Sequence, residues 1–416
     1  NPTKRGDTRL VGAPDHLALA REAVAKSLVL LKNNDATLPV KPGARVLIAG
    51  PGADNMAMQA GGWTISWQGG DTRAEDFTNG QTIGRAVADA VRSGGGQAEI
   101  SPSGDFGVKP DVAIVVMGER PYAEFEGDVP HLAFQPTSGE EDMIARLKAK
   151  GVRVAVVFLS GRPMFTGKLI NQADAFVAAW LPGTQGRGIA DVLVAGADGK
   201  PPRDFTGRLS FAWPSDARSP VAAPLFPIGY GQSYSQSAPL GPVNEDARVD
   251  LSAGGQANFY MRRGNVPAPW RLAVDGSVTS RVTDISAQED ARQFTWNAKG
   301  ILAIEGAPVD LTAQAGADFA LLIDWRIDTP VAGPLLLSFG GVSVDISAPV
   351  SSSPTGTAVQ TRVPLSCFAG TTANLANVGS PFRLEAGSGF VATLRNIQIE
   401  AADQNIQSVA CPGQLP

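Results

Sequence analysis

Residues 112–117 read Val112-Ala113-Ile114-Val115-Val116-Met117 and are followed by Gly118. An unbroken apolar run of this length, rich in β-branched side chains, is typical of a strand that is buried on both faces. Such strands occur in mainly parallel sheets that helices cover on both sides. The run therefore indicates the centre of an α/β layer structure.

Similar apolar runs lie before and after it, separated by stretches whose apolar residues recur at helical spacing. The runs are Val46–Ala49, Val154–Leu159 and Ala175–Ala179, and the helical stretches are Thr82–Ser93, Glu140–Lys150 and Gly188–Ala195. Helical spacing also predicts an amphipathic helix over Leu17–Leu31. Together these elements predict one α/β domain with a mostly parallel sheet over residues 17–235, preceded by a polar linker over residues 1–16.

The composition changes after Tyr234, where Ser, Gly, Pro and Val become frequent and lysine almost disappears. Short strand patterns follow at Ala257–Met261, Phe319–Ile327, Leu335–Ile346 and Val391–Glu400. In the last pattern Ile397 and Ile399 alternate with polar residues, as in a strand with one solvated face. We therefore expect an all-β domain, a jelly-roll-like β-sandwich, over residues 242–416.

Composition and charge exclude several classes of partner. The chain has 416 residues, of which 43% are apolar and 18% charged, as in a packed globular protein of two or three domains. A net charge of −5 without a basic stripe argues against nucleic acid. No apolar run reaches the roughly 18 residues of a membrane span, so a membrane partner is not expected. Because the first residue is Asn1 rather than Met, we expect a fragment or a processed piece.

The sequence predicts no cofactor and no metal site. Its two cysteines, Cys367 and Cys411, lack a Cys-x-x-Cys spacing, and His16 and His131 are the only histidines. Two readings of the cysteines stay open. One is a disulfide that holds the C-terminal tail, which would suit an exported protein, and the other is a pair of buried thiols.

A glycine-containing turn, Gly50–Asp54, follows the first apolar run and superficially resembles a dinucleotide-binding loop. The third glycine of that motif is missing, and Pro51 removes a backbone N–H that a phosphate would need. No acidic residue closes a second strand about 20 residues on. Nucleotide binding is therefore a minor alternative.

Two tryptophans, Trp63 and Trp67, lie between the paired glycines Gly61-Gly62 and Gly69-Gly70. Glycine neighbours leave indole faces open, and an open indole is a flat apolar platform on which a sugar ring can stack. The alternative is that both indoles fill a domain interface, the commoner fate of tryptophan. The pattern by itself leaves both readings open.

Four acidic residues follow the central apolar run within ten positions: Glu119, Glu124, Glu126 and Asp128. Ligand sites in open α/β sheets favour the carboxyl ends of strands. Carboxylates this close repel one another, Arg120 is the only base among them, and a partly buried one holds its proton longer. The alternatives are a proton-donating loop and a solvated acidic loop.

Together these segments resemble the C-terminal domain of glycoside hydrolase family 3, in particular that of its exo-acting β-glucan glucohydrolases. The matching motifs occur in family order over residues 21–231: Arg21–Ala23, Ser27–Asn33, Ala53–Asn55, Gly61–Gly69, Gly118–Asp128, Ser160–Pro163, Ala179–Gly183 and Pro224–Gly231. The residues after Gly241 resemble, more weakly, a β-sandwich that is appended to some bacterial members.

The resemblance assigns roles to residues of both loops. The family's general acid/base is the second glutamate of a Gly-Glu-x-Pro-Tyr-x-Glu loop, which is Glu124 here, and the first glutamate, Glu119, is the alternative. Trp67 matches an indole that flanks the leaving-group sugar, while Trp63 is expected to be structural. Arg162 and residues 180–183 match positions that we assign to architecture.

The resemblance also implies that half of the active site lies on a domain outside this sequence. The family's nucleophile is an aspartate in a Ser-Asp-Trp context on a preceding (β/α)8 barrel, which we expect to be the partner domain of this chain. Two similar stretches, Ser215-Asp216 in a Pro-bounded loop and Ile323-Asp324-Trp325 in a predicted strand, are not expected to supply it. By itself the chain should be inactive.

The implied activity is that of a retaining β-glucosidase or exo-β-glucanase that acts on β-1,3/1,4-glucan oligosaccharides, in a bacterial periplasm or outside the cell. The alternative, of a different class, is a carbohydrate-binding or structural module without catalysis of its own. In that reading Trp270, Trp296 and Trp325 of the β-sandwich could bind glycan, although burial in the core is the commoner fate of each.

Overall fold

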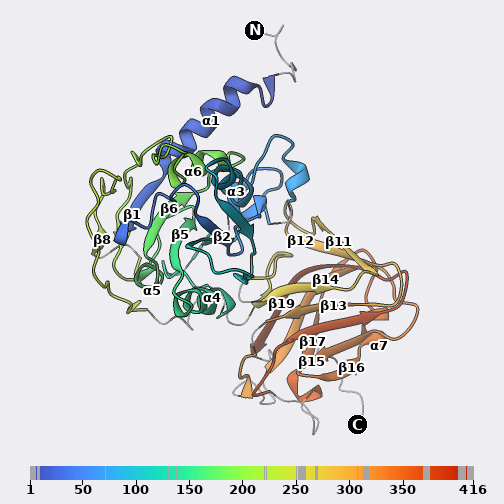
Figure 1. Cartoon of the computed structure of the whole chain (residues 1–416). Helices are drawn as coiled ribbons and strands as arrows, with labels where there is room; N and C mark the ends of the chain where they lie inside the picture. Colours follow the sequence, from blue (N-terminus) through green and yellow to red (C-terminus); the bar gives the residue numbers. More distant parts are fainter. Residues whose placement is uncertain are drawn as a thin grey trace. The chain divides into compact units, whose positions relative to one another are not determined.

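The computed structural model describes residues 6, 10–70, 72–124, 126–129, 131–136, 138–219, 221, 223–249, 251, 259–267, 270–306, 308–312, 319–368, 375–401 and 409. The chain divides into two compact units, Asn1–Leu251 and Ser252–Pro416 (Figure 1). Each unit has its own buried core and is described by itself. Within the described ranges, no helix is both long and apolar enough to cross a bilayer.

The first unit is built on a six-stranded sheet in the order β1-β6-β5-β4-β2-β3. Its strands are β1 (Val29–Asn33), β2 (Arg45–Ala49), β3 (Gln97–Ile100), β4 (Val112–Gly118), β5 (Arg153–Leu159) and β6 (Ala175–Trp180). All neighbours pair in parallel except β1, which is antiparallel to β6. The predicted central strand, β4, lies between β2 and β5.

Helices cover both faces of this sheet, as the apolar runs predict. The helices are α1 (Pro14–Ser27), α2 (Met56–Ala60), α3 (Ile83–Ser93), α4 (Ser138–Ala149), α5 (Gly167–Gln172) and α6 (Gly186–Leu193). Ile114 and Val116 of β4 pack in one core with α1, α3 and α6, whereas Val115 packs in a second core with α4 and α5. In Figure 1, α3 and α6 lie on one side of the sheet, and α4 and α5 on the other.

The helix predicted over Leu17–Leu31 is wrong in its second part. The helix ends at Ser27, and Val29–Asn33 form the edge strand β1. Leu28 and Leu31 are fully buried, so these residues follow the continuous apolar pattern of a strand rather than the face of a helix. Leu19, at the exposed end of the predicted apolar face, is 67% exposed.

Residues 240–247 are attached to the rest of the first unit by hydrogen bonds. The side chain of Asn34 exchanges two bonds with the backbone of Leu240, and Asn171 does the same with Val243. The backbone N–H of Ala217 donates to the carbonyl of Ala247. The structural division between Leu251 and Ser252 therefore lies downstream of the predicted boundary at residues 235–242.

The second unit is a sandwich of two antiparallel sheets, which confirms the predicted fold class of α/β plus all-β. The five-stranded sheet runs β10-β13-β18-β15-β16 and the six-stranded sheet β11-β12-β19-β14-β17, with β9 pairing β19. The strands are β9 (Phe259–Met261), β10 (Arg271–Val274), β11 (Val278–Thr283), β12 (Ala291–Trp296), β13 (Gly300–Glu305), β14 (Phe319–Thr329), β15 (Leu336–Phe339), β16 (Val342–Asp345), β17 (Ala358–Pro364), β18 (Phe382–Ala386) and β19 (Val391–Ala401).

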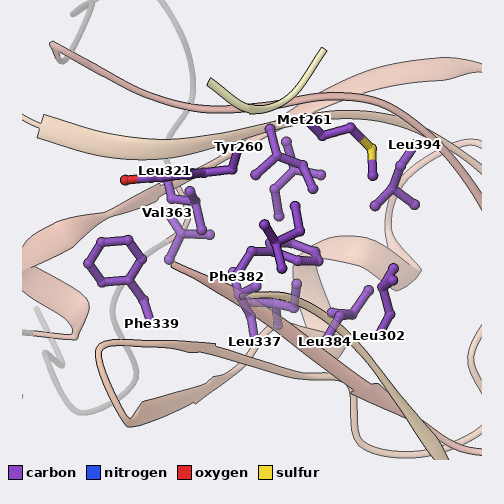
Figure 2. Close-up of a cluster of buried hydrophobic side chains, with 14 of the residues drawn as sticks. Tyr260, Met261, Leu302, Leu321, Leu337, Phe339, Val363, Phe382, Leu384 and Leu394 are labelled. Atoms are coloured by element: carbon purple, nitrogen blue, oxygen red, sulfur yellow. The ribbon is translucent and has the colours of Figure 1, made fainter. Parts of the chain in front are cut away.

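Alternate residues of both sheets meet in one core. Figure 2 shows Leu302, Leu337 and Leu384 of the five-stranded sheet together with Leu321, Val363 and Leu394 of the six-stranded sheet. The strand predicted over Leu335–Ile346 is instead a hairpin of β15 and β16. Gly340 and Gly341 make the turn with φ of 58° and 87°, which glycine adopts without strain.

The tryptophans of this unit belong to the core. Trp296 and Trp325 have no exposed surface and Trp270 has 8%, and the indole N–H of Trp325 donates to Thr361. Cys367 takes part in a disulfide, and Cys411 lies outside the described residues. The cysteine reading that the structure supports at Cys367 is therefore the bonded one.

Replacing Trp296 by alanine tests whether these indoles are core residues. Trp296→Ala removes a fully buried ring, so we expect the free energy of unfolding to fall by about 3–5 kcal/mol, measured by urea unfolding. The matched control is Val274→Ala in the same unit, where a side chain 43% exposed should change stability by no more than about 0.5 kcal/mol. Equal stability of Trp296→Ala and wild type would contradict the core assignment.

Candidate functional site

Residues 119–128, which we call the acid loop, begin where β4 ends beside β5. Because these strands are parallel neighbours, their carboxyl ends lie at the same edge of the sheet, where ligand sites of such folds are found. At Gly118 a Cβ atom would lie 1.8 Å from the Leu159 carbonyl oxygen, so the ends of β4 and β5 approach too closely for any side chain at this position. Glu119 follows on β4, and Ser160 follows on β5.

Glu119 is held by three side chains. Its Oε2 accepts hydrogen bonds from Tyr122 Oη at 2.9 Å and Ser160 Oγ at 2.7 Å. Its Oε1 lies 3.1 Å from Arg162 Nε and 3.0 Å from Arg162 Nη2. A carboxylate with this set of partners is fixed in position, so proton transfer to a substrate would have to break these contacts.

Arg162 also ties the rest of the loop to the end of β5. Its Nη1 donates to the Gly127 carbonyl at 2.7 Å, and its guanidinium lies 4.5 Å from the centre of the Tyr122 ring. Burial, and next the charge of Glu119, raises the pKa of the Tyr122 phenol, so this hydroxyl acts as a donor. Arg120, the basic residue within the loop, pairs with Glu140 of α4 at 3.5 Å rather than with a glutamate of the loop.

Glu124 lies in the same loop but in a different setting. Its side chain is exposed, and one carboxylate oxygen, Oε2, accepts from both indoles: Trp67 Nε1 at 2.7 Å and Trp63 Nε1 at 2.9 Å. The acid loop and residues 61–70, which we call the tryptophan segment, therefore form one site. No cation is bonded to Glu124 in the part of the chain that the structure describes.

The electrostatic effect of these donors is to favour the charged form. The indole N–H of Trp67, followed by the backbone N–H of Glu124 itself, holds the pKa of Glu124 below its usual range. Desolvation opposes these two donors, and the indole N–H of Trp63, the smallest of the four contributions, again lowers the pKa. The expectation that crowding would raise a carboxyl pKa in this loop is not met at Glu124 in the chain by itself.

The two indoles differ in exposure. Trp67 is 7% exposed, whereas Trp63 is 65% exposed, and their ring centres lie 6.1 Å apart. Trp63 has a φ of 55°, a left-handed conformation that is strained for a bulky residue. The open indole face thus belongs to Trp63, although the resemblance gave the sugar-contacting role to Trp67.

The other candidate segments have structural partners. In the turn Gly50–Asp54, the carboxylate of Asp54 accepts from Thr82 and pairs with Arg85 at 3.1 Å, which fixes the start of α3. Asp216 pairs with Arg218 at 2.7 Å, and Asp324 with Arg395 at 2.6 Å. Among the described residues, no group of three or more His, Cys, Asp or Glu side chains could hold a metal ion.

Sequence reasoning missed three side chains that shape the site: Gln68, Tyr122 and Ser160. Tyr122 and Ser160 stand in the matched motifs, and Ser160 follows the strand next to β4, so its place at the same sheet edge was predictable from the strand runs. Gln68 also stands in a matched motif, Gly61–Gly69, but nothing in a linear sequence shows that its side chain would reach residues 123 and 124.

A pH titration of tryptophan fluorescence tests the contact between Glu124 and the indoles. We expect an emission change with a midpoint below the ordinary glutamate pKa of about 4.3, because two N–H donors stabilise the ionised form. Glu124→Gln should abolish it, and Trp67→Phe should raise the midpoint more than Trp63→Phe does. A transition that persists unchanged in Glu124→Gln would show that the indoles do not sense this carboxylate.

Comparison with protein families gives two matches along the chain. A family model described as the glycosyl hydrolase family 3 C-terminal domain matches residues 28–234. A second, described as galactose-binding domain-like, matches residues 263–399. These matches fall within the two structural units, one in each.

Similar proteins include β-glucosidases. The lysosomal beta glucosidase of Dictyostelium discoideum is 28% identical in an alignment of length 254, which covers 52% of this chain and 30% of that protein. The periplasmic beta-glucosidase of Salmonella typhimurium is 28% identical in an alignment of length 270, which covers 53% of this chain and 35% of that protein.

A solved structure covers nearly the whole chain. The exo-1,3/1,4-beta-glucanase from a Pseudoalteromonas species is 34% identical, with a TM-score of 0.57, over 97% of this chain and 53% of that one. This chain thus spans about half the length of the solved relative and about a third of the curated ones. The chain therefore belongs to glycoside hydrolase family 3 and carries the C-terminal domain of that family, followed by a galactose-binding-like β-sandwich.

Proposed function

We propose that this chain is the C-terminal part of a retaining, exo-acting β-glucan glucohydrolase or β-glucosidase that releases glucose from non-reducing ends of β-1,3- or β-1,4-glucans. In this proposal Glu124 is the general acid/base. The observation that carries it is an exposed carboxylate at the carboxyl edge of the sheet, bonded to two indoles of which Trp63 is open to solvent. A carboxylate beside an open indole suits a sugar ring with a departing oxygen.

Glu119 is the poorer candidate for the same role. It is bound by Arg162, Ser160 and Tyr122, so it has no position from which to reach a substrate without breaking these contacts. In our proposal it anchors the loop, and Glu124 at the exposed end of the loop performs the proton transfers. This assignment retains the order of preference that the resemblance gave.

The retaining mechanism needs a second carboxyl group roughly 5 to 5.5 Å away, which attacks the anomeric carbon. We assign this nucleophile to an aspartate of the (β/α)8 barrel that the resemblance implies. Glu124 first protonates the departing oxygen and then, as a base, takes a proton from the water that hydrolyses the glycosyl intermediate. The barrel also supplies most contacts to the terminal glucose.

The first step requires a protonated Glu124, whereas the indoles favour the ionised form in the chain by itself. In our proposal the approach of the barrel and the substrate reverses this preference. Covering the exposed carboxyl of Glu124 removes its solvation, and the barrel places the negative charge of the nucleophile beside it. Both effects raise the pKa of a carboxyl group. The same combination lets one glutamate act as acid and then as base.

Leaving-group dependence tests the role of Glu124, with the chain joined to a family 3 barrel. Glu124→Gln should lower turnover of laminaribiose by about 10²- to 10⁴-fold, because its leaving sugar needs a proton. Release of dinitrophenolate from a 2,4-dinitrophenyl β-glucoside should show a preserved burst, because that leaving group departs without protonation. Glu119→Gln is the control and should affect both substrates alike. An equal loss on both substrates in Glu124→Gln would contradict the assignment.

A second candidate function, glycan binding by the β-sandwich, is favoured by the galactose-binding-like match over residues 263–399. Against it, the tryptophans that we considered for this role are buried. We expect calorimetry of the whole chain with laminarin and cellulose oligomers to give heat that depends on Trp63 and disappears in Trp63→Ala. Heat that persists in Trp63→Ala would support a binding site in the second unit.

A further inference from the structure

Gln68 joins the tryptophan segment to the backbone of the acid loop. Its side chain is almost fully buried, with 6% of the residue exposed. Its Oε1 accepts from the backbone N–H of Ala123 at 2.8 Å, and its Nε2 donates to the backbone carbonyl of Glu124 at 3.0 Å. One carboxamide thus binds backbone groups of two successive residues, one of which is Glu124.

This arrangement supplements the two indole contacts. Trp63 and Trp67 hold the carboxylate of Glu124, whereas Gln68, the residue next to Trp67, holds the peptide from which that side chain projects. Fixing both the backbone and the carboxylate of one residue removes the freedom that an exposed loop residue otherwise has. Neither kind of contact does so alone.

Two backbone features keep Gln68 within reach. At Gly62 a Cβ atom would lie 2.3 Å from the Tyr122 carbonyl oxygen, so residues 61–70 and the acid loop approach too closely for a side chain at this position. The backbone N–H of Trp63 donates to the Trp67 carbonyl at 2.8 Å, which closes the turn that carries both indoles. The two stretches therefore pack as one body around Glu124.

We infer that Gln68 is a positioning residue, which fixes the backbone at Ala123 and Glu124 so that the Glu124 carboxylate stays within hydrogen-bonding distance of the two indole N–H groups. The inference rests on the proposed function only in taking Glu124 as the acid/base. A proton donor must be held to within a fraction of an ångström of its productive place, and an error of about 1 Å can cost about 10²-fold in rate. Gln68 supplies this precision without contact with the substrate.

Gln68→Met tests the inference, because methionine keeps the length of the side chain and removes both hydrogen bonds. In the full chain, the midpoint of the Glu124-dependent fluorescence transition should move upward, as the carboxylate loses its alignment with the indoles. Adding Glu124→Gln should remove the transition itself. Gln68→Ala serves as a second variant, and circular dichroism confirms that each variant is folded over the pH range.

The matched control is Gln232→Met. Gln232 is also 6% exposed, donates to Tyr230 Oη at 2.9 Å and accepts from the backbone N–H of Ala238, on a different part of the unit. Its replacement removes a buried carboxamide in the same way and should leave the midpoint unchanged. If Gln68→Met and Gln68→Ala, both folded, titrate like wild type, or if the Gln232 variant shifts equally, the inference is wrong.

This readout separates the inference from the proposed function. The fluorescence midpoint reports the setting of Glu124 in this chain whether or not it is the acid/base. With a barrel attached, Gln68→Met should lower kcat by about 10²-fold with little change in KM. An upward midpoint together with an unchanged kcat would keep Gln68 as a positioning residue and remove the catalytic role of Glu124.

Discussion

The parallel pairing of β4 with β5 is the constraint on which the site depends. It brings the ends of two strands to one edge, so that Glu119 from one strand meets Ser160 and Arg162 from the other. These contacts hold both ends of the loop, at Glu119 and at Gly127. The exposed residue between them, Glu124, is then left to be positioned by a third segment, residues 61–70. A polar site thus follows directly from the order of strands in an apolar sheet.

Charge is distributed in this loop so that Glu119 and Glu124 have partners of different charge. Glu119 is neutralised by Arg162, which comes from the adjacent strand rather than from the loop. Glu124 is stabilised by neutral N–H donors, so its protonation state responds to whatever covers it. An acid/base must change protonation state twice in a catalytic cycle. In our proposal this residue is Glu124.

The sequence predicted the sheet better than the site. Apolar runs located β2, β4, β5 and β6, because strands buried on both faces leave an unbroken signal in the sequence. The prediction of a helix fails at the edge strand β1, because Leu28 and Leu31 fit a helical spacing and a strand pattern equally well. The motifs indicated Glu124 and the tryptophans but not which indole is exposed, which depends on the left-handed backbone at Trp63. Gln68 was invisible because its partners are backbone groups, which every sequence contains.

The galactose-binding-like unit has a complete core of its own, and the family 3 domain presents an exposed carboxylate and an open indole at one edge. Our central claim is that this edge is half of a retaining active site, completed by an aspartate on a barrel. The most direct measurement is a crystal structure of this chain joined to a family 3 barrel with a bound glucoside. We predict a separation of roughly 5 to 5.5 Å between the carboxyl groups of Glu124 and the nucleophilic aspartate. If Glu119 lies at that distance instead, or if no carboxyl group of this chain does, the account is contradicted.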